Sequence, residues 1–275
     1  MKILIVGHGF VGRAVEYGFS TVKNSITIVD PKYGNSLSDI DLADYEVTFV
    51  CVPTPMNNDG SIDSSILDSV MNIINSKYRT SDHLVIIKST VTPDVLKQYS
   101  DFGVIYNPEF LREATALEDF VKPEFHIFGG LKSWDCNRAE ELYNNHSNCS
   151  RAPAFYMSYT EASLAKYAIN SFLALKVTFF NQLYDTAEAS GADFSRIVKV
   201  VESDKRIGSS HTRVPGFDGR RGYGGSCFPK DTSAIINYTD KLSLVEETVK
   251  VNNAYRKSYE LNQREKDQNI SFVEN

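Results

Sequence analysis

Short apolar runs alternate with amphipathic stretches over the first half of the chain. The runs are rich in β-branched residues and are bounded by polar or glycine-containing segments, which favours strands, whereas the stretches between them have the spacing of helices. Strands that alternate with helices predict an α/β fold with a parallel, doubly wound sheet. The predicted strands are 2–6, 25–29, 46–52, 83–88 and 103–106, with 126–130 as a further candidate, and the predicted helices are 13–21, 62–77 and 93–99.

The apolar period changes after about Ser158. Ser158 and Glu161 form a possible capping box, and apolar residues then occupy several faces as far as position 190. This pattern predicts a long, largely buried helix that Gly191 ends.

The rest of the chain predicts an all-α second domain. Further helices are predicted at 193–203 and 242–261, and the polar tail from Asn262 is expected to fray. The polar segment 144–156 is the expected linker, so we predict domains at 1–152 and 153–275.

Composition and charge narrow the class of protein. The 275 residues are 42% hydrophobic and carry a formal net charge of -6. This charge gives no electrostatic sign of binding to nucleic acid or to an anionic membrane. The apolar run at 3–6 is too short for a signal peptide, and no run reaches membrane-spanning length. Four cysteines without paired spacing indicate neither a disulfide framework nor a metal site. We therefore expect a cytoplasmic protein with reduced thiols.

A glycine pattern follows the first strand. Gly7, Gly9 and Gly12 lie between a strand and a helix, and Asp30 ends the next strand. Such a turn lets a pyrophosphate approach backbone amides at the helix N-terminus, while the acidic residue binds the ribose hydroxyls. The carboxylate would repel a 2′-phosphate, which favours NAD over NADP, although two nearby lysines weaken this inference. The alternative is a glycine turn in a nucleotide-free α/β protein.

A second motif, residues 222–231, surrounds Cys227 with three glycines, a proline and a Lys-Asp pair. This composition predicts a tight polar turn into a helix. A thiolate there can attack an aldehyde that hydride transfer has produced, so an alcohol could be taken to the acid. The alternative is a buried apolar cysteine. The other three, Cys51, Cys136 and Cys149, are interpreted as structural or incidental.

These motifs resemble those of the UDP-glucose/GDP-mannose dehydrogenase family, the nucleotide-sugar 6-dehydrogenases. The resemblance covers nearly the whole chain and includes Val52-Pro53-Thr54-Pro55, Ser89-Thr90-Val91, the stretch 107–113 and the stretch 166–176. It implies a Rossmann-type domain followed by a helical central domain. It also implies that two NAD oxidise a 6-hydroxymethyl group through an aldehyde, a cysteine thiohemiacetal and a thioester that water hydrolyses.

The resemblance implies a catalytic role for several residues. Cys227 would be the nucleophile, and Glu109, helped by Thr90, would activate the water. Lys166 and Asn170 are four positions apart, so a helix places them on one face, where an ammonium and an amide can stabilise an oxyanion. The alternative for Lys166 is a solvated helix lysine.

Other roles also follow from the resemblance. Asp231 would assist Lys166 and the water, and Glu113 would lie near the nicotinamide, although Glu109 or Glu113 could instead pair with Arg112. The implied cofactor-binding residues are Gly7, Gly9, Phe10, Val11, Gly12, Asp30, Val52, Pro53, Thr54, Ser89, Thr90 and Glu113. The implied substrate-binding residues are Glu109, Phe110, Leu111, Arg112, Lys166, Asn170, Arg206, Tyr223, Gly224, Gly225 and Ser226.

Arg206 resembles an arginine that reaches the substrate of the neighbouring subunit, with a helix-end surface charge as the alternative. The long apolar helix predicts a homodimer.

Family members continue into a third, nucleotide-recognising domain, whereas this sequence stops at Asn275. We favour a short dehydrogenase in which the cation-rich segment 212–221 or a dimer partner contacts the substrate, with UDP-glucose as the first candidate. One alternative is a truncated NAD-binding pseudo-enzyme. Another is a dehydrogenase of the 3-hydroxy-acid or 6-phosphogluconate type, which performs one oxidation and needs no cysteine.

Overall fold

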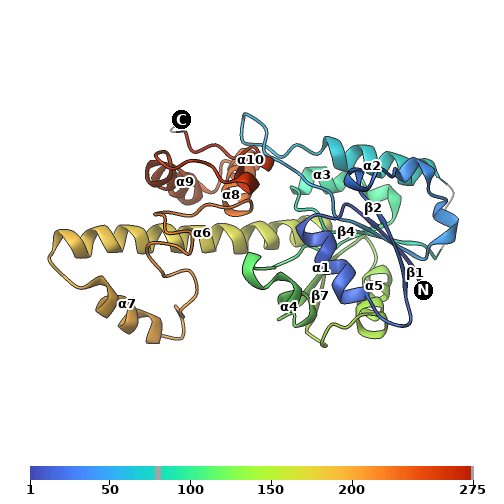
Figure 1. Cartoon of the computed structure of the whole chain (residues 1–275), viewed down its shortest axis with the longest axis horizontal. Coiled ribbons are helices and arrows are strands. Elements are labelled where there is room, and N and C mark those ends of the chain that lie inside the picture. The colour runs from blue at the N-terminus through green and yellow to red at the C-terminus, as the bar shows by residue number, and fades with distance from the viewer. Residues whose placement is uncertain (78–81, 274–275) are drawn as a thin grey trace. The chain divides into compact units, whose positions relative to one another are not determined.

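The computed structural model describes residues 1–77 and 82–273 (Figure 1). The chain divides into two compact units. Unit 1 comprises Met1–Thr54 and Asp63–Lys166, and unit 2 comprises Pro55–Ile62 and Tyr167–Asn275. The division therefore falls after Lys166, because the segment expected to be a linker contains a strand of the sheet. The predicted domains 1–152 and 153–275 remain a prediction.

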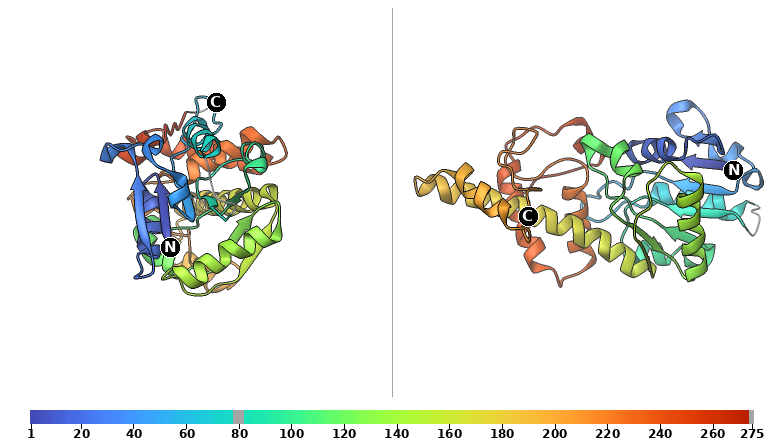
Figure 2. Two further views of the ribbon diagram at one scale, coloured as in Figure 1. Left: turned by 90° about the vertical axis from the view of Figure 1, so that its right-hand side faces the viewer. Right: turned by 90° about the horizontal axis from the view of Figure 1, so that it is seen from below.

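Unit 1 is built on a twisted sheet with helices on both faces (Figures 1 and 2). The described residues form seven strands in the order β2-β1-β3-β4-β5-β6-β7. The strands are β1 (Lys2–Val6), β2 (Ser25–Val29), β3 (Val47–Val50), β4 (Leu84–Ile87), β5 (Val104–Tyr106), β6 (His126–Gly129) and β7 (Ala154–Met157). The helices are α1 (Phe10–Phe19), α2 (Ser65–Ser76), α3 (Pro93–Lys97), α4 (Ala116–Val121) and α5 (Ser133–His146).

The fold class predicted from the sequence is confirmed, with one difference at the sheet edge. Neighbouring strands pair in parallel except β5 and β6, which are antiparallel at Tyr106 and Gly129. The sequence analysis gave no direction for the strand at 126–130, and this strand runs antiparallel to β5. The side-chain period of a strand reports which face is buried and carries no information on the direction of its neighbour.

One face of the sheet packs on α1, α4 and α5. Ile3 and Ile5 point to this face, and Phe19 of α1 lies against Phe49 of β3 and Tyr143 of α5, with ring centroids 4.9 and 5.2 Å apart. Helix α1 begins three residues earlier than the predicted start at position 13, because the last part of the glycine turn forms its first turn. The sequence analysis missed α4, α5 and β7. Helix α5 is mostly polar and buries only a narrow stripe of side chains, whereas α4 and β7 are short, with six and four residues.

Helix α6 (Tyr159–Ala189) begins in unit 1 and continues into unit 2. Its predicted capping box is present, since Ser158 N–H donates to Glu161 Oε2 at 2.8 Å and Glu161 N–H to Ser158 Oγ at 3.3 Å. Gly191, the predicted end of the helix, has a left-handed conformation with φ of 66°. The remaining helices of unit 2 are α7 (Phe194–Ser203), α8 (Phe228–Tyr238), α9 (Ser243–Arg256) and α10 (Gln263–Asp267).

The C-terminal segment is folded, which corrects the expectation that it frays from Asn262. Asn262 and Glu265 form a reciprocal capping box at the start of α10. Glu265 is fully buried, and Ile270 and Phe272 are 3% and 8% exposed. Helix α9 ends at Arg256, five residues before its predicted end, and the chain then turns back to deliver these buried side chains. Residues 274–275 of the predicted tail lie outside the described part.

Within the described ranges, none of the helices is both long and apolar enough to cross a membrane.

Candidate active site

The glycine turn after β1 has the geometry of a phosphate-binding turn. Gly7 has φ of 88°, and a Cβ there would lie 2.6 Å from the Cys51 carbonyl oxygen. A Cβ on Gly12 would overlap the Gly7 carbonyl, so these two positions are closed to any side chain. A Cβ on Gly9 would meet no atom within 4 Å. The turn therefore leaves open space at Gly9 beside the N-terminal amides of α1, where a pyrophosphate can bind.

Asp30 lies at the carboxyl end of β2. It accepts hydrogen bonds from the backbone N–H groups of His8 at 2.6 Å and Lys32 at 3.0 Å. Partial burial acts to raise the pKa of Asp30, but these hydrogen bonds prevail and lower it, so the carboxylate is ionised. Of the two lysines near the predicted ribose site, Lys32 bonds the His8 carbonyl and Lys23 the Asn145 carbonyl at 3.2 Å. The charge of Asp30 thus fits a ribose diol better than a 2′-phosphate.

The strand-end loops predicted to hold the cofactor are bonded to each other. Ser89 Oγ donates to the Val52 carbonyl at 2.6 Å, and Thr54 Oγ1 donates to the Thr90 carbonyl at 2.9 Å. These loops follow the carboxyl ends of β3 and β4. The strand order changes beside them, because β1 lies between β2 and β3. In doubly wound sheets ligands bind at this change of strand order, outside the carboxyl ends of the strands. Phe10, Val11 and Pro53 belong to the same turn and loops.

Lys166 is buried and paired with the predicted general base. Lys166 is 2% exposed. Its Nζ lies 3.3 Å from Glu109 Oε1 and also donates to the Glu109 carbonyl. The ammonium also lies 4.9 Å from the centroid of the Phe110 ring. Glu109 Oε2 accepts from Leu111 N–H at 2.6 Å. The alternative of a solvated lysine is therefore wrong, because burial with one carboxylate fixes the position of this ammonium.

Arg112 forms an ion pair with Asp119, and Glu109 forms its own with Lys166. Its guanidinium makes a two-point contact, with Nη2 2.6 Å from Oδ1 and Nε 3.1 Å from Oδ2. This pairing is the main reason that the pKa of Asp119 is lowered. Glu113 begins a 3-10 turn (Glu113–Thr115) and is exposed. The proposed roles of Arg112 in substrate binding and of Glu113 beside the nicotinamide remain predictions.

In unit 2, Cys227 is the residue immediately before α8, so it lies at the N-terminus of an 11-residue helix. Its Sγ is 3.7 Å from Ser226 Oγ. The side chain is partly exposed, whereas Cys51 and Cys136 are buried. Helix N-termini favour a thiolate over a thiol, which fits a nucleophilic role for Cys227.

Asp231 holds two partners at the first turn of α8. Its Oδ2 accepts from Asn170 Nδ2 at 2.5 Å, and its Oδ1 lies 2.6 Å from Lys230 Nζ. All three side chains are nearly inaccessible to solvent. The sequence analysis did not assign a role to Lys230, although its place beside Asp231 in the cysteine motif was a usable signal.

Two helices from the C-terminal part of unit 2 hold the glycine-rich loop before Cys227. Tyr223 N–H donates to Asn252 Oδ1 of α9 at 2.6 Å, and Gly225 N–H donates to Glu265 Oε1 of α10 at 2.9 Å. The sequence analysis missed Asn252 and Glu265, since neither lies in a recognisable motif.

The predicted diphosphate-binding cations make contacts within unit 2. Arg206 is largely exposed and pairs with Asp204 at 2.6 Å, which is the surface arrangement weighed as its alternative. Arg220 bonds the Glu260 carbonyl at 2.6 Å, and Arg221 pairs with a carboxylate of α6 at 2.7 Å. Their roles in holding a substrate remain predictions.

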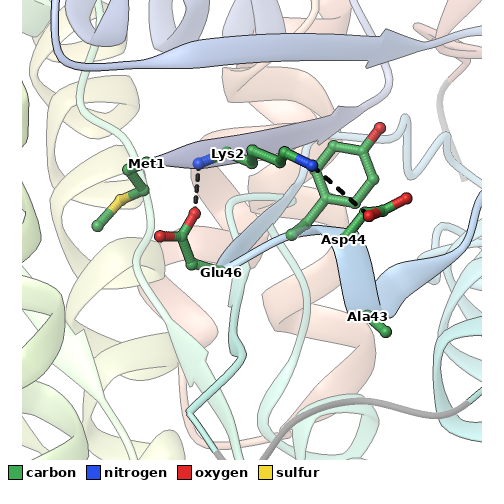
Figure 3. A pocket seen from close by; sticks show the side chains of 6 residues that line it. Met1, Lys2, Ala43, Asp44 and Glu46 are labelled. Atoms are coloured by element: carbon green, nitrogen blue, oxygen red, sulfur yellow. Dashed lines mark hydrogen bonds and ion pairs between the residues drawn. The ribbon is translucent and has the colours of Figure 1, made fainter.

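The cavity in Figure 3, of about 380 Å³, lies elsewhere in unit 1. Lys2 crosses it and approaches Asp44 at 3.5 Å. It lies at the amino ends of β1 and β3, whereas the glycine turn follows the carboxyl end of β1, so this cavity is not part of the candidate cofactor site. Its lining residues are Met1, Lys2, Ala43, Asp44, Tyr45 and Glu46.

The sheet order, the glycine turn and Asp30 define unit 1 as a dinucleotide-binding domain of the Rossmann class. Residues 35–147 match the NAD binding domain of the UDP-glucose/GDP-mannose dehydrogenase family, and residues 160–254 match its central domain. The chain belongs to this family, and its cofactor is NAD.

Individual relatives agree with the family match. A UDP-glucose dehydrogenase structure from Pyrobaculum islandicum has a TM-score of 0.77 and 30% identity, with 92% of this chain and 68% of that chain covered. The UDP-glucose 6-dehydrogenase of Haloferax volcanii is 29% identical over 86% of this chain and 65% of its own length. The GDP-mannose 6-dehydrogenase of Pseudomonas aeruginosa is 32% identical over 73% of this chain and 48% of its own length. The chain thus spans about two thirds or less of the curated relatives it matches.

Proposed function

We propose that this protein is an NAD-dependent nucleotide-sugar 6-dehydrogenase that oxidises a 6-hydroxymethyl group to a carboxylate. UDP-glucose is the first candidate substrate, with UDP-glucuronate as product. The observation that carries the proposal is the partly exposed Cys227 at the N-terminus of α8, in a chain whose other unit binds NAD. The named activities of the relatives support the same class of reaction.

The overall reaction converts one primary alcohol, two NAD⁺ and one water into a carboxylate, two NADH and three protons. NAD accepts one hydride in each oxidation when it is bound. After the first oxidation Cys227 adds to the aldehyde, forming a sulfur–carbon bond while a proton moves to the former carbonyl oxygen. Loss of the remaining hydride from that carbon to the second NAD⁺, together with loss of the hydroxyl proton, gives a thioester. Water then breaks the sulfur–carbon bond, releasing the acid and restoring the thiol.

The buried polar residues would stabilise charge in these steps. Lys166 and Asn170 are one turn apart on α6, and each has a donor for an oxyanion on the reacting carbon. Glu109 holds an acceptor oxygen beside Lys166 and is the candidate base for the hydrolytic water, with Thr90 in support. Asp231 orients Asn170 through a direct hydrogen bond.

The proposal is tested by counting NADH formed per sugar consumed, with UDP-glucose, UDP-N-acetyl sugars and GDP-mannose in turn. Two NADH and one uronic acid are expected from one of them. One NADH would indicate the single-oxidation class. NAD binding without turnover of any of these sugars would favour the pseudo-enzyme.

Cysteine variants sharpen this test. In Cys227→Ser the acid should disappear while aldehyde or a stalled adduct accumulates. Cys149→Ser, at the other partly exposed cysteine, should turn over normally. Equal acid production by both variants would remove Cys227 from the mechanism.

We further propose that the protein is a homodimer that acts in the cytoplasm, with a nucleotide sugar as its small-molecule partner. The dimer proposal is supported by apolar side chains on α6 and α7 of unit 2. Phe172, Phe179 and Val200 are 65%, 55% and 74% exposed, and α7 contains no buried residue. Reduced thiols are typical of the cytoplasm and suit a catalytic cysteine.

A further inference from the structure

A serine and an arginine form a hydrogen-bonded chain that leads to Cys227. Arg264 Nη2, on α10, lies 3.1 Å from Ser226 Oγ, and that oxygen lies 3.7 Å from Cys227 Sγ. All three side chains are partly buried. These two hydrogen bonds therefore connect the proposed nucleophile to a cation 37 positions further along the sequence.

The chemistry of these groups determines which atom donates in each of the two hydrogen bonds. A guanidinium has donors only, so Ser226 Oγ must accept from Arg264. The hydroxyl hydrogen of Ser226 then remains available to donate to the cysteine sulfur. A sulfur that receives a hydrogen bond is stabilised as the thiolate, because hydrogen bonds to a charged acceptor are stronger than those to a neutral one.

The fold fixes Arg264 through the next residue. Glu265 is fully buried, and its carboxylate accepts from Gly225 N–H at 2.9 Å and pairs with Arg256 Nη2 at 3.0 Å. Gly225 belongs to the loop that carries Ser226 and Cys227. Helix α10 is therefore attached to the same loop by a buried contact, which keeps the Arg264 side chain near Ser226.

Two groups of paired charges in unit 2 lie beside this loop. In α8, Lys230 lies 2.6 Å from Asp231, and Arg256 of α9 lies 3.0 Å from Glu265 of α10. The Lys230–Asp231 pair has no net charge, and Arg256 has a second acidic partner in Asp218 at 2.8 Å, so neither group supplies a net positive charge that would favour the thiolate.

We propose that Arg264 is a positioning residue that acts through Ser226 to favour the thiolate form of Cys227. The inference rests on the proposed function only in taking Cys227 as the nucleophile. Arg264 lies beyond residues 160–254, the part of the chain that matches the central domain of the family. The C-terminal segment would thus contribute to the reactivity of the cysteine.

The proposal is tested by the rate of alkylation of Cys227 by iodoacetamide as a function of pH, using the full chain. Mass spectrometry of the tryptic peptide 222–230 reports this cysteine alone. In Arg264→Ala the midpoint of the pH profile should rise by about half to one unit, so that alkylation below the midpoint is about three- to tenfold slower. Lys266→Ala, which removes an exposed charge from the same helix, is the matched control and should leave the profile unchanged.

A double variant tests the route through Ser226. Ser226→Ala should raise the midpoint by a similar amount, and Arg264→Ala should add little in that background. Arg264→Lys, which keeps a donor and a charge, should recover part of the shift. The inference is overturned if Arg264→Ala behaves as Lys266→Ala does, or if the two substitutions are additive. Alkylation needs neither sugar nor NAD, so the expected shifts in a protein that forms no uronic acid would remove the proposed activity and leave this inference standing.

Discussion

At the residue scale, buried charges occur in pairs at the positions where we propose the chemistry. Lys166 lies against Glu109, and Lys230 lies against Asp231, with each of these four residues at most 9% exposed. Such pairs are expensive to break, since removing one partner leaves an uncompensated buried charge at a cost of about 3–5 kcal/mol. Each pair therefore fixes the position of a charged group that the proposed chemistry would use.

Lys166→Ala should lower kcat by at least about 100-fold, because it removes an oxyanion donor, while NAD still binds to unit 1. Steady-state kinetics and calorimetric titration with NAD measure the two effects separately. Lys97→Ala, an exposed lysine of the same unit, serves as the control and should change neither. Loss of NAD affinity in Lys166→Ala would contradict the oxyanion assignment.

His126 makes the stability of unit 1 depend on pH. Burial, with a smaller contribution from the positive charge of Lys88, lowers the pKa of His126 from 6.5 to about 4. The unfolded chain therefore binds more protons between these values, and stability is lost as the pH falls from 6.5 toward 4. From pH 7 to pH 5 this histidine should cost about 2 kcal/mol in the free energy of unfolding.

His126→Phe should reduce that loss, because the substituted ring keeps the contacts with Phe128 and Tyr143, whose centroids lie 5.6 and 4.7 Å from that of His126. Urea unfolding at pH 7 and pH 5 measures the difference. An unchanged pH dependence in the variant would show that other groups cause the acid sensitivity.

At the element scale, two glycines of the turn between β1 and α1 should have different roles. Gly12 is needed for folding, whereas Gly9 is needed for binding NAD. Gly12→Ala should destabilise the protein by about 2 kcal/mol or more and abolish NAD binding, because a Cβ there overlaps the Gly7 carbonyl. Gly9→Ala should fold with little loss of stability, since its Cβ meets no protein atom within 4 Å, yet should bind NAD much more weakly. Thermal unfolding and NAD titration of both variants test this contrast. Tight NAD binding by Gly9→Ala would rule out this turn as the pyrophosphate site.

Helix α10 is an element whose position depends on one buried carboxylate. Glu265→Ala leaves Arg256, which is 1% exposed, without one of its two acidic partners. We expect a loss of about 3 kcal/mol in the free energy of unfolding, measured with urea. Glu260→Ala, at an exposed position in the preceding loop, should cost less than about 0.5 kcal/mol. A similar small cost for Glu265→Ala would mean that α10 is not anchored by this pair.

At the scale of the whole molecule, the apolar surface of unit 2 bears on assembly. Phe172 and Phe179 are seven positions apart on α6, so they lie on one face. Placing a charge at both positions, Phe172→Glu with Phe179→Glu, should convert a dimer into a monomer, because charges are excluded from interface cores. Sedimentation velocity measures the change. Phe217→Glu, at a loop residue that is 93% exposed, is the control and should remain dimeric. A parent protein that is already monomeric would refute the dimer.

Much of the fold and part of the site could be predicted because their signals are local. The period of apolar residues within a strand or helix, the spacing of Gly7, Gly9 and Gly12, and the composition around Cys227 each involve neighbours along the chain. The predicted helix ends were less accurate than the helices themselves, since the residues after Arg256 leave the helix to reach partners elsewhere in unit 2.

The sequence by itself determined the class of fold and pointed to the candidate NAD-binding turn and the candidate nucleophile. Only the tertiary structure decided the antiparallel pairing of β5 with β6, the burial of Lys166 against Glu109 and the docking of Glu265 on the loop at Gly225. The last two contacts join residues 57 and 40 positions apart. The physical reason is that such pairings depend on where the chain returns in space, which the local pattern of polar and apolar residues does not record.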